Sequence, residues 1–300
     1  QKRINLLNKH YPLKIEQCNY SNFQRKFEDD NMKRIKKIYD VTKNSFINQG
    51  LIFFGGYASS LYSKYMPKKI RSKFTEEPDF DVLSMNPYQS CVILKERLSD
   101  EGIKDVSINK KKNLGEVISE HYEVRVGHDA IAVAYTPLSC HSYNIIRDGK
   151  NKVKVATIDT MLSFYLAFIY ANRPYYDKDR ILCMANFLFQ VQQRNRLKQK
   201  GLLRRFSISC MGNQKSLEEI RGEKADKFIE LKDKRGSEEY EGWFLKYRPG
   251  DKEDKKIIKK KDKKEVKKEV KRKTVKKNYK KTQTKTRTKT QKNFISRFFK

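Results

Sequence analysis

Two aspartates one residue apart, Asp79 and Asp81, constrain the fold of this 300-residue chain more than any other feature. They belong to an apolar stretch, residues 80–83, that predicts a strand. Alternate residues of a strand point to the same face of a sheet, so both carboxylates face one side. Two like charges held this close are costly unless a cation lies between them. The pair therefore indicates a site for two divalent cations with aspartate oxygens as ligands.

A Gly-Gly pair upstream supplies the second half of the pattern. Residues 51–54 predict a strand, and Gly55 and Gly56 lead from it into a helix predicted over 57–65. Backbone N–H groups at such a turn can approach a phosphate closely, and the helix N-terminus favours its negative charge. Ser59, in the first turn, can donate a hydroxyl hydrogen bond to the same phosphate. A triphosphate site beside a carboxylate pair is the arrangement that nucleotidyl transfer requires.

A third carboxylate on a neighbouring strand would complete such a site. Asp129 is the first candidate because it opens the apolar strand predicted over 130–135, and Glu123, in the preceding predicted strand, is the second. If the position lies two or three residues beyond Asp129, Ile131 or Ala132 occupies it and the group is missing. Paired aspartates and Gly-Gly turns are each common. Their order between apolar strands carries the prediction.

Charge points to the class of partner. The chain carries 68 Lys and Arg against 36 Asp and Glu, a net charge of +32. Residues 251–300 alone hold 23 Lys and Arg and 6 Asp and Glu, a net charge of +17. Such an excess indicates a polyanionic partner, with nucleic acid ahead of an anionic membrane surface. The longest strongly apolar run, residues 161–171, is too short to span a bilayer, and no secretory signal is recognisable, so no membrane partner is expected.

The five cysteines are far apart, odd in number and without a CxxC pair. This pattern predicts free thiols in a reducing compartment rather than a disulfide framework, and it argues against a structural zinc site. The residues are Cys18, Cys91, Cys140, Cys183 and Cys210.

The order of the apolar patterns predicts an α+β fold, a mixed sheet of nucleotidyltransferase type with flanking helices. We expect an N-terminal helical segment over 1–44, a catalytic domain over 45–150, a helix-rich second domain over 151–250 and a disordered Lys-rich tail over 251–300. Helices are predicted over 22–49, 91–98, 161–171, 177–200 and 217–234, and near Trp243. Further strands are predicted over 121–126, 153–156 and 202–211, and residues 66–77 are predicted to form a loop. The basic residues near 64–73 and 194–205 form either solvated surface or contacts to RNA phosphates.

Three segments carry a family resemblance. GGYASSLY followed by DFDVL resembles the DNA polymerase β-like nucleotidyltransferase superfamily. The segments TIDTMLSFYLAFIYANRPYY, RILCMANFLFQVQQRNRLKQKGLLRRFSISCMG and EEYEGWFLKYRPG resemble the poly(A) polymerase catalytic subunits of giant cytoplasmic DNA viruses of the mimivirus type. The poxvirus enzymes are similar more distantly.

The resemblance implies transfer of AMP from ATP to RNA 3′ ends with two Mg²⁺ or Mn²⁺ ions. It implies that Gly55, Gly56 and Ser59 hold the triphosphate and that Asp79 and Asp81 hold the metals. The third acidic role, for metal binding and catalysis, passes to Asp129. A second copy of the chain, or a processivity or cap-methylating subunit, is an open choice of protein partner. The implied location is the host cytoplasm, in the viral factory, and the virion.

An alternative reading keeps the fold without the chemistry. A chain that lacks the third carboxylate would be a catalytically inactive, nucleotidyltransferase-like RNA-binding or scaffold subunit. A nucleotidyltransferase acting on a small molecule or a protein also fits the motif, but it leaves the net charge of +32 unexplained.

Overall fold

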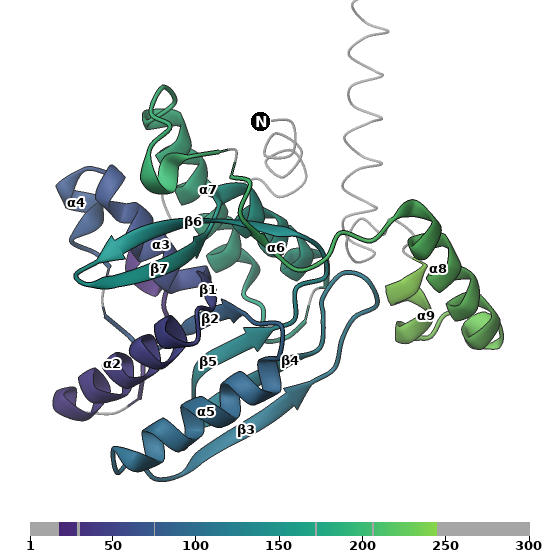
Figure 1. Ribbon diagram of the computed structural model, residues 1–300, viewed down its shortest axis with the longest axis horizontal. Coiled ribbons are helices and arrows are strands. Elements are labelled where there is room, and N and C mark those ends of the chain that lie inside the picture. The colour runs from purple at the N-terminus through teal and green to yellow at the C-terminus, as the bar shows by residue number, and fades with distance from the viewer. Residues whose placement is uncertain (1–17, 29–30, 75, 172, 206, 245–300) are drawn as a thin grey trace, which may run out of the picture. The chain divides into compact units, whose positions relative to one another are not determined.

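The computed structural model describes residues 18–28, 31–74, 76–171, 173–205 and 207–244 (Figure 1). These residues belong to one compact unit, Gln1–Phe244, and Leu245–Lys300 form a second unit. The tail that the sequence predicts to be disordered, and residues 1–17 of the predicted N-terminal segment, lie outside the described residues. None of the helices in the described part is long and apolar enough to cross a membrane.

A mixed eight-stranded sheet organises the first unit. Its order is β3-β4-β5-β2-β1-β7-β6-β8. In the centre, β2 is antiparallel to β1 and parallel to β5, so strands distant in sequence meet side by side. The predicted α+β fold with a mixed sheet is confirmed. The strands are β1 (Ile52–Phe54), β2 (Phe80–Leu83), β3 (Val106–Lys111), β4 (His121–Val126), β5 (Asp129–Tyr135), β6 (His141–Asp148), β7 (Asn151–Ala156) and β8 (Cys210–Met211).

Helices cover both faces of this sheet. On one face lie α2 and α5 (Figure 1), where the rings of Tyr39 and Phe80 are 5.1 Å apart. On the other face, Phe164 of α6 stacks on Phe54 at 4.7 Å. The aromatic residues of β1 thus divide between two hydrophobic layers. The helices are α2 (Met32–Asn48), α3 (Gly55–Tyr62), α4 (Lys68–Arg71), α5 (Pro87–Asp100), α6 (Ile158–Ala171), α7 (Lys178–Arg194), α8 (Leu217–Leu231) and α9 (Glu238–Trp243), with 3₁₀ turns η2 (Tyr20–Asn22), η3 (Ser63–Tyr65), η4 (Gly201–Leu203) and η5 (Lys232–Lys234).

Capping residues explain where the helices begin. The Asn31 side chain accepts hydrogen bonds from the backbone N–H groups of Lys33 and Arg34, so α2 starts at Met32 and not near residue 22 as predicted. Asp177 caps α7 in the same way. Ser216 and Glu219 form the capping box at the start of α8 that the sequence predicts.

Other boundaries differ from the prediction because tertiary pairing decides them. The predicted loop 66–77 contains α4, and α7 ends at Arg194 instead of continuing to residue 200. Of the strand predicted over 202–211, only β8 forms, where it pairs with β6. The division predicted at residue 150 falls in the turn between β6 and β7, which are hydrogen-bonded neighbours in the sheet. The sheet therefore crosses the predicted boundary between catalytic and second domains.

The prediction of free thiols is wrong for four of the cysteines. Cys18 pairs with Cys183 and Cys140 pairs with Cys210, with Cα atoms 5.5 and 5.3 Å apart, and only Cys91 is free, buried in the core. The partners are separated by 165 and 70 residues in sequence. Separations this long cannot be recognised by spacing alone, since the fold brings the partners together.

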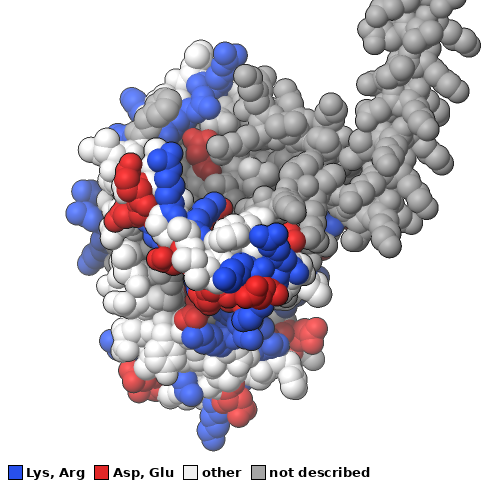
Figure 2. Space-filling view, turned by 90° about the vertical axis from the view of Figure 1, so that its right-hand side faces the viewer, with Lys and Arg blue, Asp and Glu red and all other residues white. Residues whose placement is uncertain are grey.

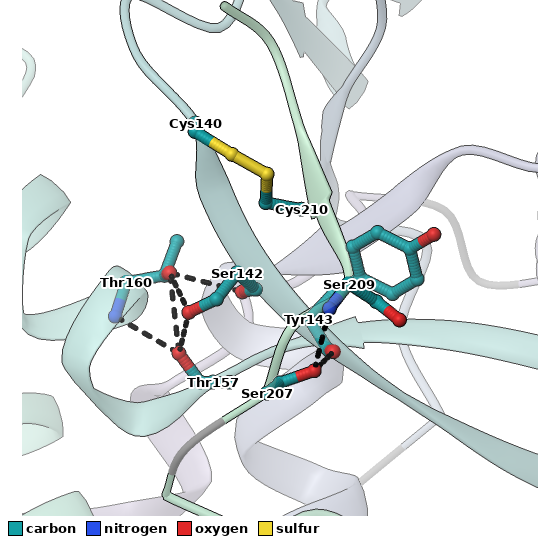
Figure 3. Close-up of a disulfide and its surroundings, with 8 residues drawn as sticks. All are labelled: Cys140, Ser142, Tyr143, Thr157, Thr160, Ser207, Ser209 and Cys210. Carbon is teal, nitrogen blue, oxygen red and sulfur yellow. Dashed lines mark hydrogen bonds between the residues drawn. A yellow bond between two sulfur atoms is a disulfide. The ribbon is translucent and has the colours of Figure 1, made fainter. Parts of the chain in front are cut away.

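The second disulfide lies among hydroxyl groups that join three elements (Figure 3). Ser207 Oγ donates to the Tyr143 carbonyl of β6 at 2.6 Å, next to the short β8 pairing. On the other side, the hydroxyl oxygens of Ser142 and Thr157 are 2.8 Å apart. The Thr160 hydroxyl donates to the Ser142 carbonyl at 2.9 Å. The disulfide thus closes a chain segment that hydrogen bonds already hold in place.

A thiol count tests the pairing. Denatured without reductant, the protein should present one reactive thiol, Cys91, and five after reduction. Because both disulfides close long loops, reduction should lower the free energy of unfolding by about 2–5 kcal/mol. Five reactive thiols in protein purified and denatured without reductant would contradict the pairing.

Candidate active site

The register of the sheet collects the candidate residues on one face. Asp81 lies beside Phe54 of β1 on one side and Val133 of β5 on the other. Val133 in turn lies opposite Glu123 of β4. Residues directly opposite one another in neighbouring strands point to the same side, so Asp81 and Glu123 share a face with Val133 between them. Asp79, two residues before Asp81, points the same way.

This face lines a cavity of about 360 Å³, within the range of roughly 300–1,000 Å³ found for ligand sites. Three of the predicted residues, Asp79, Asp81 and Asp129, line it together with Gly55. Gly56 and Ser59 are not among the lining residues. The further polar and aromatic residues of the wall are Arg25, Lys26, Lys111, His121, Glu123, Arg125, His128, Tyr135, Tyr165, Phe168, Tyr175, Tyr176 and Arg180.

The two glycines are required for different reasons. Gly55 has a φ of +66°, and a Cβ at this position would overlap the carboxylate of Asp81. A Cβ on Gly56 would lie 2.6 Å from the Phe23 carbonyl oxygen. Gly55 therefore allows the turn at the start of α3 to lie against the carboxylate pair, and Gly56 allows the N-terminal segment to pack on that turn. No side chain caps α3, which leaves its first N–H groups available to an anion.

Ser59 is placed differently from its predicted role. Its side chain is fully buried, and its hydroxyl donates to the Gly55 carbonyl at 2.9 Å and lies 3.5 Å from the Tyr165 hydroxyl. In this arrangement Ser59 supports the first turn of α3 and does not face the cavity.

The segment 18–28, here called the N-terminal strap, borders the cavity. The backbone N–H of Arg25 donates to Asp79 Oδ2 at 2.9 Å, and the backbone N–H of Glu28 donates to Asp129 Oδ2 at 3.1 Å. Arg180 of α7 approaches the same Asp79 oxygen at 3.8 Å. Since the disulfide of Cys18 ties the strap to α7, the Arg25 backbone and the Arg180 side chain reach Asp79 from covalently joined elements.

Charge at the site is unequally shared between the two aspartates. Burial, with a further contribution from Asp79, raises the pKa of Asp81 to about 7, although Arg25 and Arg180 act in the opposite direction. Burial works against the charge of Arg25, but the carboxylates of Asp79 and Asp81 together raise its pKa. The ionised form of Asp81 is therefore costly in the cavity, and a further cation would stabilise it.

The donor set suits a hard divalent cation bound together with a nucleotide. Among the described residues, no three His, Cys, Asp or Glu side chains gather closely enough to hold a metal ion by themselves. Mg²⁺ is often bound by one or two carboxylates, with substrate phosphates and water as the remaining ligands. Asp79 and Asp81 fit that mode of binding, because a cation would stabilise the ionised form of Asp81.

Neither candidate for the third carboxylate occupies the position next to Asp81. That position on β5 belongs to Val133, two residues beyond Ile131 and one beyond Ala132. Asp129 lies at the start of β5, opposite Val126. Glu123 is buried one strand further out, where its Oε2 lies 3.3 Å from Lys111 Nζ and 3.8 Å from Arg125 Nη1.

The cationic half of the site carries no motif in the sequence. Arg25 precedes any recognisable motif, and only the fold of the strap brings it to Asp79. Arg180 could have been found, because it directly precedes Ile181 and lies one turn before Met184, two apolar residues of a predicted amphipathic helix. An arginine that adjoins a buried apolar stripe indicates a partner of opposite charge.

The mixed sheet, the Gly-Gly turn and the carboxylate pair on one strand define a nucleotidyltransferase-like fold. Among solved structures, the chain is similar to the crystal structure of the Megavirus polyadenylate synthase, with a TM-score of 0.54 and 16% sequence identity. The similarity covers 79% of this chain and 49% of the synthase chain, so this chain spans about half the length of that protein. No protein-family model and no curated protein matches the chain. The resemblance to viral poly(A) polymerases is confirmed at the level of the fold.

The raised pKa of Asp81 predicts a pH-dependent stability. Between about pH 4 and pH 7 the folded chain holds a proton on Asp81 that the unfolded chain has lost, so the free energy of unfolding should fall as the pH rises through this window. Asp81→Asn should flatten that decline, and Asp100→Asn, on the exposed end of α5, should not. Urea unfolding at a series of pH values measures the effect. A decline that persists unchanged in Asp81→Asn would contradict the assignment.

Proposed function

We propose that the chain is a template-independent RNA nucleotidyltransferase that adds AMP from ATP to RNA 3′ ends, a viral poly(A) polymerase. The observation that best supports this proposal is the cavity in which Asp79 and Asp81 face Gly55 at the uncapped N-terminus of α3. An anion-binding turn and a cation-binding carboxylate pair are in contact there, and the fold is shared with a polyadenylate synthase.

Each part of the cavity has a role in the proposed reaction. Asp79 and Asp81 would hold Mg²⁺ or Mn²⁺, which when bound would neutralise phosphate charge and activate the RNA 3′-hydroxyl. The N–H groups at Gly55 would receive the triphosphate. The 3′-oxygen of RNA forms a bond to the α-phosphorus of ATP, the bond to the β-phosphate oxygen breaks, and pyrophosphate leaves with that electron pair. Arg25 and Arg180 can contribute positive charge toward the leaving group.

Flat ring faces in the same cavity suit a nucleotide base. His121 stacks on Tyr135 at 4.6 Å, and Tyr176 stacks on Phe168 at 4.5 Å. Burial lowers the pKa of His121, which favours the neutral imidazole next to the base. These rings provide apolar surface beside the charged half of the cavity, as nucleotide binding requires.

The register of β5 supports a second candidate function. Val133 carries no group that could bind a metal, although it occupies the place next to Asp81. A chain with valine at this place could bind RNA as an inactive, nucleotidyltransferase-like subunit of a larger assembly. The proposed setting in the host cytoplasm and virion, and a second copy or a processivity or cap-methylating subunit as partner, rest on the family resemblance.

Primer extension tests the proposed function. With labelled RNA and Mg²⁺ or Mn²⁺, ATP should give a ladder, and each of the other three nucleotides should give much less. Asp79→Ala/Asp81→Ala should reduce extension by at least about 100-fold, because the cation ligands are lost. RNA binding without extension by any nucleotide would favour the inactive subunit.

The same assay decides between the third carboxylates. If Glu123 reaches across Val133 toward the metals, Glu123→Gln should reduce extension by about 100-fold while Asp129→Asn changes it little. The reverse outcome would assign the role to Asp129. Val133→Asp provides a gain-of-function control, since it restores a carboxylate next to Asp81. Full activity in both single variants would show that two aspartates suffice.

The basic tail should act through electrostatics alone. Deleting residues 251–300, with their net charge of +17, should flatten the dependence of RNA affinity on salt, because fewer counterions are released on binding. Fluorescence anisotropy of labelled RNA over a salt series measures the slope. An unchanged slope would rule out a contribution of the tail to RNA binding.

A further inference from the structure

A second basic surface forms where α7 ends and the chain turns back. Between Arg194 and Arg205 there are six cationic residues and no Asp or Glu. All six side chains are exposed. We call them the basic patch: Arg194, Arg196, Lys198, Lys200, Arg204 and Arg205.

Four members of the basic patch share one shallow depression. Arg196, Lys198, Arg204 and Arg205 line it, and Asp159 is the one carboxylate residue among the lining residues. In the part of the chain that the structure describes, none of the six forms an ion pair with a carboxylate. Elsewhere on the surface, Lys215 pairs with Glu223 and Lys224 pairs with Glu116.

The contrast is visible on the side that carries α8 and α9. Figure 2 looks onto that side, where Lys and Arg side chains lie among Asp and Glu side chains. Interspersed charges of both signs are the usual solvated surface of a protein. The basic patch has one sign only, and a single-sign surface attracts a polyanion over long distances.

Hydrogen bonds hold the backbone of the patch in place. Asn195 donates to the Tyr65 carbonyl at 3.2 Å, and Asn144 donates to the Arg204 carbonyl at 2.9 Å. Gln192, with its amide oxygen turned toward Arg205, accepts from Nε of that guanidinium at 2.9 Å. Leu202 and Leu203 are buried beneath the turn. The charges are therefore presented by a folded surface, which lowers the entropic cost of binding.

The composition of the patch indicates which part of a nucleic acid it would contact. No aromatic residue lies between Arg194 and Arg205, so the patch offers no platform on which bases could stack. Guanidinium and ammonium groups alone bind phosphates without reading sequence. This chemistry suits the backbone of an RNA of any sequence and not its reacting end.

The helix α7 links the patch to the candidate active site. Arg180, near its start, approaches Asp79, and Arg194 ends it. At 1.5 Å per residue the two arginines are separated by about 21 Å along the helix. We propose that the basic patch binds the phosphate backbone of single-stranded RNA upstream of the 3′ end, a proposal that rests on the proposed function in naming RNA as the substrate.

The test compares two full-length variants that lose the same charge. Arg196, Lys198, Arg204 and Arg205 are changed to Gln in one. Lys33, Lys36, Lys95 and Lys104, exposed residues on or near α2 and α5 without ion pairs among the described residues, are changed to Gln in the other. Anisotropy with single-stranded RNAs of about 4 and about 16 nucleotides is followed over a salt series without ATP or metal.

The patch variant should bind the longer RNA at least tenfold more weakly at low salt. The magnitude of its salt slope should fall by about 2–3, at roughly 0.7 per lost phosphate contact. The control variant should change little, and the short RNA should bind both variants alike. Equal losses in the two variants would show that only net charge matters, and equal losses for both RNA lengths would rule out an upstream contact. Either result would overturn the proposal.

Two further measurements keep the test decisive. Melting temperatures establish that both variants are folded, and Arg196→Gln/Lys198→Gln replaces the patch variant if that one unfolds. Vesicles containing anionic lipid serve as a competing polyanionic surface, and a patch variant that loses vesicle binding but keeps RNA binding would overturn the assignment. Binding is measured without ATP. The effect of the patch on RNA binding can therefore be read even if the protein does not extend a primer.

Discussion

The charge balance around Asp79 and Asp81 is the constraint on which the rest of the site depends. The carboxylate of Asp81 in β2 and that of Asp79, directly before this strand, repel each other, and burial adds to the cost at Asp81. A backbone N–H from Arg25 and the guanidinium of Arg180 offset that cost at Asp79. Asp81 receives no comparable hydrogen bond from the described residues. The charge of Asp79 is therefore offset by neighbouring groups, whereas the ionised form of Asp81 remains costly. Carboxylates with perturbed pKa values are typical of functional sites.

The architecture around the pair follows from this balance. The strap and α7 must both reach Asp79, although more than 150 residues separate them in sequence. Gly56 allows the strap to pack on the turn before α3, and the disulfide between Cys18 and Cys183 joins the strap to α7. Removing the disulfide would leave the packing of Phe23 on Phe187, 5.5 Å apart, to hold the two elements together. The disulfide and the aromatic contact thus join the same two elements, the strap and α7, which both contact Asp79.

Local pattern predicted the centre of the molecule well and its edges poorly. β2 forms where the apolar residues around Asp81 predict it, and β4 and β5 follow from runs of alternating or apolar residues. β3 was missed because only Val106 and Ile108 among its residues are apolar and none is fully buried, and it exists through pairing with β4. The disulfides and the strap were beyond reach for the same reason, since both depend on contacts between distant segments. The triphosphate role of Ser59 stays a prediction, and in the structure its hydroxyl bonds within its own turn of the helix.

The position of Val133 makes the sheet register the deciding feature for function. A shift of one residue in β5 would turn the Val133 side chain away from Asp81. It would bring Ala132 or Ala134 to that place, and neither residue supplies a carboxylate. The missing group must therefore come from a neighbouring strand or not at all. Glu123 is the residue that the sheet places on the same face, and its charge is already offset by Lys111 and Arg125. A glutamate has one more methylene than an aspartate, which partly compensates for the additional strand between it and Asp81. An active enzyme of this design would hold its third carboxylate one strand further from the pair, beside Lys111 and Arg125.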